Sequence, residues 1–382
     1  MDNKSNPMHD QIIGSTKVLN TFFEELESLT RSILTTPEIY KIRRLIFIGS
    51  GDSFFAAKAA ESSFINHSKL PVEVRPSLEG GQYHSVFLES RDLENALVIA
   101  LSNSGMTSRT YEAALMYKKA GARILGITQN GSSLLAEEAH NILILPKSNL
   151  PSAPNYFTFI CSFLTLVLIG LRIGEVRMKE TMDEVGEKRK ELLGYIKDLS
   201  KVVNKTDEKA HLIAEKCRNV KIFEFVGAGA NLATADYGAA KILEAVGRHS
   251  LARDLEEWVH LNYFDSKPEE IATILLSPIN CRCESRLFEI YNYMCKLRKI
   301  LVVVGGGPLI DYVEKNDGTT LRCEFNIREI WSPLFLSTPI ALLASHLSEI
   351  EGAIFGRGGI GPWEDSQEAK TVQNSKIMGL NS

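Results

Sequence analysis

Short apolar runs alternate with helical stretches along the first 150 residues. The runs lie at 45–48, 71–74, 96–101, 122–127 and 141–145, and Ala-rich or amphipathic segments separate them. Continuous apolar runs of this length are typical of strands that are buried on both faces of a sheet. Strands that alternate with helices predict an α/β fold with a parallel, doubly wound sheet.

The same pattern recurs in the second half of the chain. Gly49-Ser50-Gly51 corresponds to Gly227-Ala228-Gly229, Leu78-Glu79 to Leu255-Glu256, and Ser102 to Ser277, at offsets between 175 and 178 residues. A nearly constant offset indicates duplication, and therefore two α/β domains of one fold. We predict an N-terminal domain at 1–190, a C-terminal domain at 200–355 and an arm at 356–382, with a charged helix over 176–210 between the domains.

One apolar segment, 156–171, holds sixteen residues without a charge. A bilayer requires about 18–20 such residues, so we expect a helix buried inside a domain and no membrane partner. The polar N-terminus shows no apolar core of a signal peptide, which favours a cytoplasmic protein.

Composition excludes several other classes. Forty-three basic residues against 47 acidic ones give a net charge of −4, which disfavours a nucleic-acid partner. The six cysteines lack zinc spacing and are interpreted as reduced thiols, and no compact set of His and carboxylate residues implies a metal. Gly49 and Gly51 lack the third glycine of a dinucleotide fingerprint, since position 54 is Phe, so no cofactor is expected.

The turn after the run at 96–101 is the strongest chemical signal. It reads Ser102-Asn103-Ser104-Gly105-Met106-Thr107 and precedes a predicted helix. Hydroxyl groups and free backbone N–H groups at a helix N-terminus favour an anion. Because the turn has no lysine, it predicts a site for a phosphomonoester rather than a nucleotide; the alternative is an ordinary helix cap.

The segments LIFIGSGDS and LSNSGMT resemble those of the sugar isomerase (SIS) domain family. The resemblance extends over about 40–372, in particular to the isomerase half of glutamine–fructose-6-phosphate aminotransferase. It implies tandem flavodoxin-like domains and a phosphosugar ligand. The phosphate would bind to Ser102, Asn103, Ser104 and Thr107, with Gly51 and Ser53 from the first turn.

The second half carries the family's reaction groups in this resemblance. Ala239-Ala240-Lys241-Ile242-Leu243-Glu244 matches an A-x-K-x-x-E helix, His260 follows Glu244 by sixteen residues, and Ala369-Lys370-Thr371-Val372 matches the family's tail. The sequence departs from the family at Tyr237 and at 153–156. A degenerate copy of the phosphate loop at 277–280 implies one phosphate site per chain.

Aldose–ketose interconversion assigns a role to each of these groups. A buried carboxylate with a raised pKa suits the proton transfer between C1 and C2, and Glu244 is the candidate, oriented by Lys241. His260 suits proton shuttling during ring opening. Lys370 would supply a cation or form a Schiff base.

We therefore expect a phosphosugar isomerase, or a deaminase (deglycase) of an aminosugar 6-phosphate. No cysteine precedes Cys161, so we expect no glutaminase activity. The resemblance implies a homodimer with shared active sites. The alternative is a non-catalytic regulatory protein that binds sugar phosphates.

Overall fold

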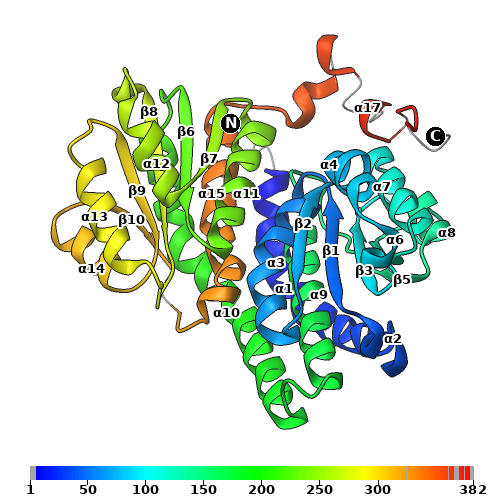
Figure 1. Ribbon diagram of the computed structural model, residues 1–382. Coiled ribbons are helices and arrows are strands. Elements are labelled where there is room, and N and C mark those ends of the chain that lie inside the picture. The colour runs from blue at the N-terminus through cyan, green and yellow to red at the C-terminus, as the bar shows by residue number, and fades with distance from the viewer. Residues whose placement is uncertain (1–5, 324, 360, 365–369, 374, 379–382) are drawn as a thin grey trace. The chain divides into compact units, whose positions relative to one another are not determined.

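The computed structural model describes residues 6–323, 325–359, 361–364, 370–373 and 375–378 (Figure 1). They divide into two compact units, each built on its own sheet. The β1 unit comprises 18–149, 158–194 and 359–382, and the β6 unit comprises 1–17, 150–157 and 195–358.

The β1 unit contains a parallel sheet of five strands in the order β2-β1-β3-β4-β5. Its strands are β1 (Arg44–Gly49), β2 (Val72–Pro76), β3 (Ala96–Leu101), β4 (Arg123–Thr128) and β5 (Asn141–Ile144). All of them lie where the apolar runs predict strands. The order is that of a flavodoxin-like sheet, as expected.

The β6 unit repeats this topology. Its strands are β6 (Ile222–Gly227), β7 (His249–Asp254), β8 (Ile271–Ser277), β9 (Ile300–Gly305) and β10 (Thr319–Arg322), in the parallel order β10-β9-β8-β6-β7. Read from β7, this is the strand order of the first sheet. The turns after β1 and β6 also have the same backbone conformation: φ is 55° at Gly51 and 56° at Gly229. The predicted duplication and fold class are confirmed.

Helices cover both faces of the β1 sheet. On one face, α6 (Ser90–Leu93), α7 (Ser108–Lys119) and α8 (Leu134–Glu138) bury Ile46, Val98 and Tyr117. On the other, α3 (Asp52–Ser68) packs through Phe64, whose ring centroid lies 4.9 Å from that of Phe47.

The β6 sheet is covered in the same way. One core surrounds Trp258 and is formed with α12 (Leu255–Leu261), α13 (Glu284–Met294) and α14 (Pro308–Lys315). The helices α11 (Ala230–Val246) and α15 (Pro333–Ile350) pack against each other, and α11 also contacts β6 and β7. The other α-helices in the described part of the chain are α1 (Pro7–Ser32), α2 (Thr36–Lys41), α4 (Ser77–Glu79), α5 (Ser85–Phe87), α9 (Phe157–Val176), α10 (Met182–Lys216) and α17 (Lys370–Gln373).

Helix α9 is longer than the apolar segment 156–171 predicted. It has 20 residues, so it is long enough to cross a bilayer, and it is the one helix in the described part of the chain with suitable length and composition. However, 94% of its most apolar 18-residue window is buried. It packs against α3, where a Cβ at Gly174 would lie 2.4 Å from the carbonyl oxygen of His67. Burial, and not a shortage of length, identifies it as a core helix.

Candidate functional site

The strand order of the β1 sheet reverses direction between β1 and β3. Ligands of open α/β sheets bind at such a switch point, beyond the carboxyl ends of the strands. The loop 102–107, which we call the phosphate loop, follows β3 there, and the turn 49–51 follows β1. The sheet therefore brings together the two sequence motifs that were predicted to hold a phosphate.

Hydrogen bonds fix the shape of the phosphate loop. The buried Ser102 hydroxyl donates to Thr107 Oγ1 at 3.1 Å, and the Gly105 N–H donates to the Ser102 carbonyl at 2.9 Å. Ser104 Oγ accepts the Met106 N–H at 3.1 Å. The loop is thus a closed turn whose hydroxyl groups lie at the N-terminus of α7, where Thr107 is the N-cap.

Gly105 lets this loop pack directly against its neighbours. Its φ is 66°, and a Cβ placed there would lie 1.9 Å from Ser133 Oγ and 2.9 Å from Thr128 Oγ1. From the same loop, the Asn103 carbonyl accepts the Gln129 N–H at 2.9 Å. The turn after β4 therefore supports the phosphate loop from behind.

A line of hydroxyl groups links the turn 49–51 to α7, the helix that follows the phosphate loop. Ser50 Oγ donates to Ser77 Oγ at 3.0 Å, and Ser77 Oγ lies 2.8 Å from Thr110 Oγ1 on α7. Gly51 is the N-cap of α3, and Ser53 lies in the first turn of that helix. Two helices of 17 and 12 residues thus begin at the switch point, and their N-termini favour an anion. Sequence reasoning missed Ser77 and Thr110, since they lie outside both motifs.

The predicted reaction groups of the β6 unit lie on two helices. On α11, Lys241 is fully buried and its Nζ donates to Glu244 Oε2 at 2.7 Å. The same Nζ lies 5.1 Å from the centroid of the Tyr237 ring, so the aromatic face also stabilises the charge. Glu244 itself is 38% exposed, which contradicts the expectation of a buried carboxylate. On α11 the Glu244 carboxylate therefore faces outward and the Lys241 ammonium faces inward.

His260 lies near the end of α12. Its side chain is 68% exposed, and its Nε2 is 3.8 Å from Glu256 Oε1. An exposed imidazole of this kind is available to a ligand or to a second protein chain.

The C-terminal arm contacts the helix that follows the phosphate loop. Lys370 begins α17, which lies against α7; the side chain of Lys370 and the preceding 365–369 lie outside the described residues. Further along the arm, the Arg109 guanidinium on α7 donates to Ser375 Oγ at 3.2 Å and to the Lys376 carbonyl. The buried Glu112 carboxylate accepts the Met378 N–H. The contact of α17 with α7 places the backbone of Lys370 in the same unit as the phosphate loop.

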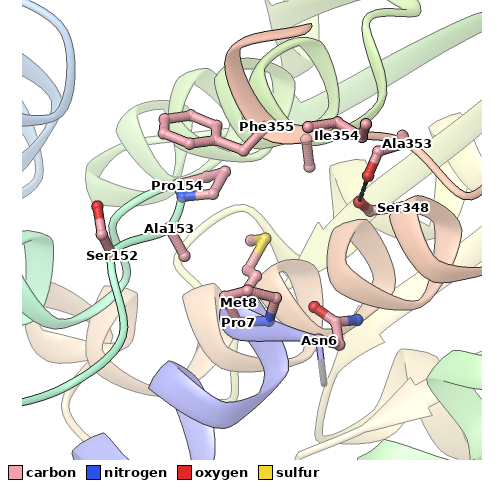
Figure 2. A pocket seen from close by; sticks show the side chains of 11 residues that line it. Asn6, Pro7, Met8, Ser152, Ala153, Pro154, Ser348, Ala353, Ile354 and Phe355 are labelled. Carbon is pink, nitrogen blue, oxygen red and sulfur yellow. Dashed lines mark hydrogen bonds between the residues drawn. The ribbon is translucent and has the colours of Figure 1, made fainter. Parts of the chain in front are cut away.

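Figure 2 shows a cavity of about 290 Å³ in the β6 unit. It is lined by Asn6, Pro7, Met8, Ser152, Ala153, Pro154, Ala245, Ser348, Ala353, Ile354 and Phe355. The segment 152–154 includes positions where the sequence departs from the family pattern, and Ala245 follows Glu244 on α11. The walls are mainly apolar, so this cavity is unsuited to a phosphate.

Three residues far apart in the sequence come together in the β6 unit. His9, Asp207 and His346 place their ligand atoms within 4.8 Å of one another. Sequence reasoning found no compact metal-binding set, because these residues lie 198 and 139 positions apart.

Comparison with known proteins identifies an SIS domain at residues 38–170. Over 343 residues the chain is 24% identical to the glutamine–fructose-6-phosphate aminotransferase (isomerizing) of Thermotoga maritima, which covers 89% of this chain and 54% of that protein. The chain thus spans about half the length of the curated relatives it matches. The resemblance predicted from the two motifs is confirmed.

Solved structures share the fold over almost the whole chain. The C-terminal domain of glucosamine-fructose-6-phosphate aminotransferase from Francisella tularensis gives a TM-score of 0.79 at 17% identity, covering 93% of this chain and 98% of that one. A glucosamine-6-phosphate deaminase from Thermotoga maritima gives 0.66 at 19% identity, covering 91% and 96%. These likenesses show the fold that both sheets adopt.

Proposed function

We propose that this chain, which carries an SIS domain at residues 38–170, is an enzyme that moves a carbonyl group between C1 and C2 of a hexose or aminosugar 6-phosphate. The observation that carries the proposal is the phosphate loop at the switch point of the β1 sheet. Its hydroxyl groups and the two helix N-termini suit a dianionic phosphate. The loop 102–107 contains no lysine of the kind that nucleotide-binding loops carry.

The phosphate loop holds one end of the substrate. Ser102, Ser104 and Thr107 supply hydroxyl groups, and the first turn of α7 supplies N–H groups that have no acceptor within the helix. Asn103, Gly51 and Ser53 line the same site in this proposal. In this proposal the reaction groups act on the other end of the sugar, where its carbonyl group lies.

Glu244 acts as the base in this proposal. It removes a proton from one carbon of the substrate and returns it to the neighbouring carbon, which moves the carbonyl group. The 2.7 Å bond from Lys241 holds the carboxylate in one orientation. Its partial exposure leaves the carboxylate accessible to a substrate.

His260 and Lys370 complete the proposed chemistry. The exposed imidazole of His260 can both accept and donate a proton, so it suits proton transfer to the ring oxygen during ring opening. The Lys370 ammonium suits stabilisation of the negative charge that develops on the enediolate oxygen. We propose that the chain forms a homodimer and that the exposed His260 serves the site of the partner subunit.

The similarity to proteins named aminotransferase and deaminase supports an aminated substrate. With an aminosugar phosphate, proton transfer gives an imine at C2, and one water molecule then releases the amine and leaves the ketose. With an unaminated sugar phosphate, the same proton transfer gives aldose–ketose isomerisation. Both reactions use the same base, so the substrate decides between them.

A substrate screen tests this proposal. The full chain is incubated with glucose 6-phosphate, fructose 6-phosphate, glucosamine 6-phosphate and amino-acid adducts of fructose 6-phosphate, and ammonia, free amino acid, ketose and aldose are measured together. We expect turnover of at least one of them. Tight binding of a sugar phosphate without turnover of any would instead favour a regulatory protein, and absence of both would refute the proposal.

A further inference from the structure

The cluster of His9, Asp207 and His346 lies apart from the residues assigned to sugar chemistry. The three side chains come from α1, α10 and α15, all within the β6 unit. His9 Nε2 is 3.0 Å from Asp207 Oδ1 and 3.1 Å from Oδ2, and His346 Nε2 is 2.7 Å from Oδ1. Two imidazole nitrogens therefore point at one carboxylate.

This donor set suits a zinc ion. Zn²⁺ binds imidazole nitrogen and carboxylate oxygen at about 2.0–2.2 Å, which puts the ligand atoms of a tetrahedral site about 3.3 Å apart. The nitrogen–oxygen separations here, 3.0 Å and 2.7 Å, are about 0.3 and 0.6 Å shorter than that value, and all three ligand atoms fit within 4.8 Å. Small rotations of the side chains would admit the ion.

The far side of the His346 ring provides a second, independent observation. The side chain is only 9% exposed, and its Nδ1 is buried without a hydrogen-bond partner among the described residues. The nearest carboxylate is Glu349 Oε2, at 3.9 Å. If the cluster is held by hydrogen bonds alone, His346 Nε2 carries the proton and donates it to Asp207. In a neutral ring, Nδ1 then keeps a lone pair that no donor faces.

A metal ion resolves this arrangement. With Nε2 bound to the ion, the proton of the neutral ring moves to Nδ1, where it faces the Glu349 carboxylate. Ligating histidines commonly donate their second N–H to a carboxylate, which fixes the ring; the Glu349 side chain would have to move closer than its 3.9 Å to accept this bond. Asn6, which directly precedes α1, donates to the Ser345 carbonyl of α15 at 2.9 Å and so holds these two helices together beside the cluster.

The site has room for a further ligand. Asp207 and His9 are 31% and 26% exposed, so water can reach the fourth position. His211 lies one turn beyond Asp207 on α10, and its ring centroid is 5.1 Å from that of His346. Three protein ligands with an open fourth position form a common zinc arrangement.

We propose that His9, Asp207 and His346 bind one divalent transition-metal ion of the Zn²⁺ class, with Glu349 orienting His346. The ion joins α1, α10 and α15 and stabilises the β6 unit.

Metal binding to the full chain tests this proposal directly. The protein is stripped with a chelator and dialysed, and Zn²⁺ binding is followed by calorimetry. We expect one ion per chain and a rise in Tm of about 5 °C at a hundredfold excess over Kd. Co²⁺ in place of Zn²⁺ should give the visible absorption of a site with nitrogen and oxygen ligands. If the unsubstituted protein shows neither the rise in Tm nor the Co²⁺ absorption, the proposal is refuted.

Variants assign the ligands. His346→Asn and Asp207→Asn should each weaken Zn²⁺ binding at least about 100-fold, since removal of a ligand costs at least as much as loss of an outer-shell partner. His249→Gln changes an exposed histidine of β7 in the same unit and should leave the affinity unchanged. Equal Zn²⁺ affinity in His346→Asn and the unsubstituted protein would overturn the assignment, and the Co²⁺ spectrum tests it even if a variant fails to fold.

Discussion

Replacing Gly105 by alanine tests whether the phosphate loop depends on its close packing. Alanine at a φ of 66° lies in the left-handed region, which costs about 1–2 kcal/mol for a residue with a side chain. The new Cβ would also lie 1.9 Å from Ser133 Oγ and 2.4 Å from Ser133 Cβ, so a rotation of the Ser133 side chain cannot relieve the clash.

The clash has its own energetic cost. Ser133 is the N-cap of α8 and accepts the Ala136 N–H, and loss of such a cap costs about 1 kcal/mol. Together with the backbone strain, the expected loss in the free energy of unfolding is about 2–3 kcal/mol. If the loop moves instead to admit the methyl group, its donors leave their positions and the affinity for a sugar phosphate should fall at least about tenfold, which corresponds to about 1.4 kcal/mol.

Gly121→Ala is the matched control. Gly121 also has a positive φ, of 101°, but a Cβ there meets nothing within 4 Å. This control therefore includes the backbone strain without the clash. The two variants are compared by equilibrium urea unfolding, and their binding of fructose 6-phosphate is compared by calorimetry. Equal stability and equal affinity in the two variants would refute the close packing of the loop.

Three further predictions concern other parts of the structure. Glu224→Ala should lower the free energy of unfolding by about 3–5 kcal/mol in urea titrations, because the buried carboxylate accepts hydrogen bonds from Trp258 and Lys299; a loss below about 1 kcal/mol would contradict this. Burial raises the pKa of Glu180, but hydrogen bonds from His67 and Lys188 outweigh this effect and hold the pKa below 4.5. The ionised Glu180 therefore stabilises the folded protein above that pH, and this stabilisation is lost as the pH falls through the folded pKa. Glu180→Gln should therefore show a smaller loss of Tm between neutral and acid pH than the unsubstituted protein, and an identical loss would count against the assignment. Arg109→Ala should speed proteolysis after Lys376, read by mass spectrometry, whereas Arg91→Ala, which removes an exposed pair with Glu89, should not.

The strands of the β1 unit could be predicted from the sequence because each is a continuous apolar run. In the β6 unit, β7 and β10 escaped prediction. The sequence of β7 is His-Ser-Leu-Ala-Arg-Asp, and this strand lies at the sheet edge with its side chains only partly buried. Edge strands lack the apolar signal that two-sided burial imposes.

Candidate sites were predictable only where the residues lie close together in the sequence. The phosphate loop is one local motif, and the resemblance to the SIS family indicated Lys241 and Glu244, which are three residues apart on α11. The His9, Asp207 and His346 cluster required the packing of three helices, and no local pattern indicates it. The exposure of Glu244 was wrongly predicted, because helix spacing does not say which side of the helix faces the core.

The most direct test of the central claim separates binding from turnover at Glu244. In Glu244→Gln the amide keeps the size of the side chain but cannot accept a proton, so we predict unchanged binding of the sugar phosphate by calorimetry and a turnover at least about 100-fold lower. Glu289→Gln, which removes an exposed carboxylate paired with Arg286, should retain both. Turnover in Glu244→Gln equal to that of the unsubstituted protein would contradict the account.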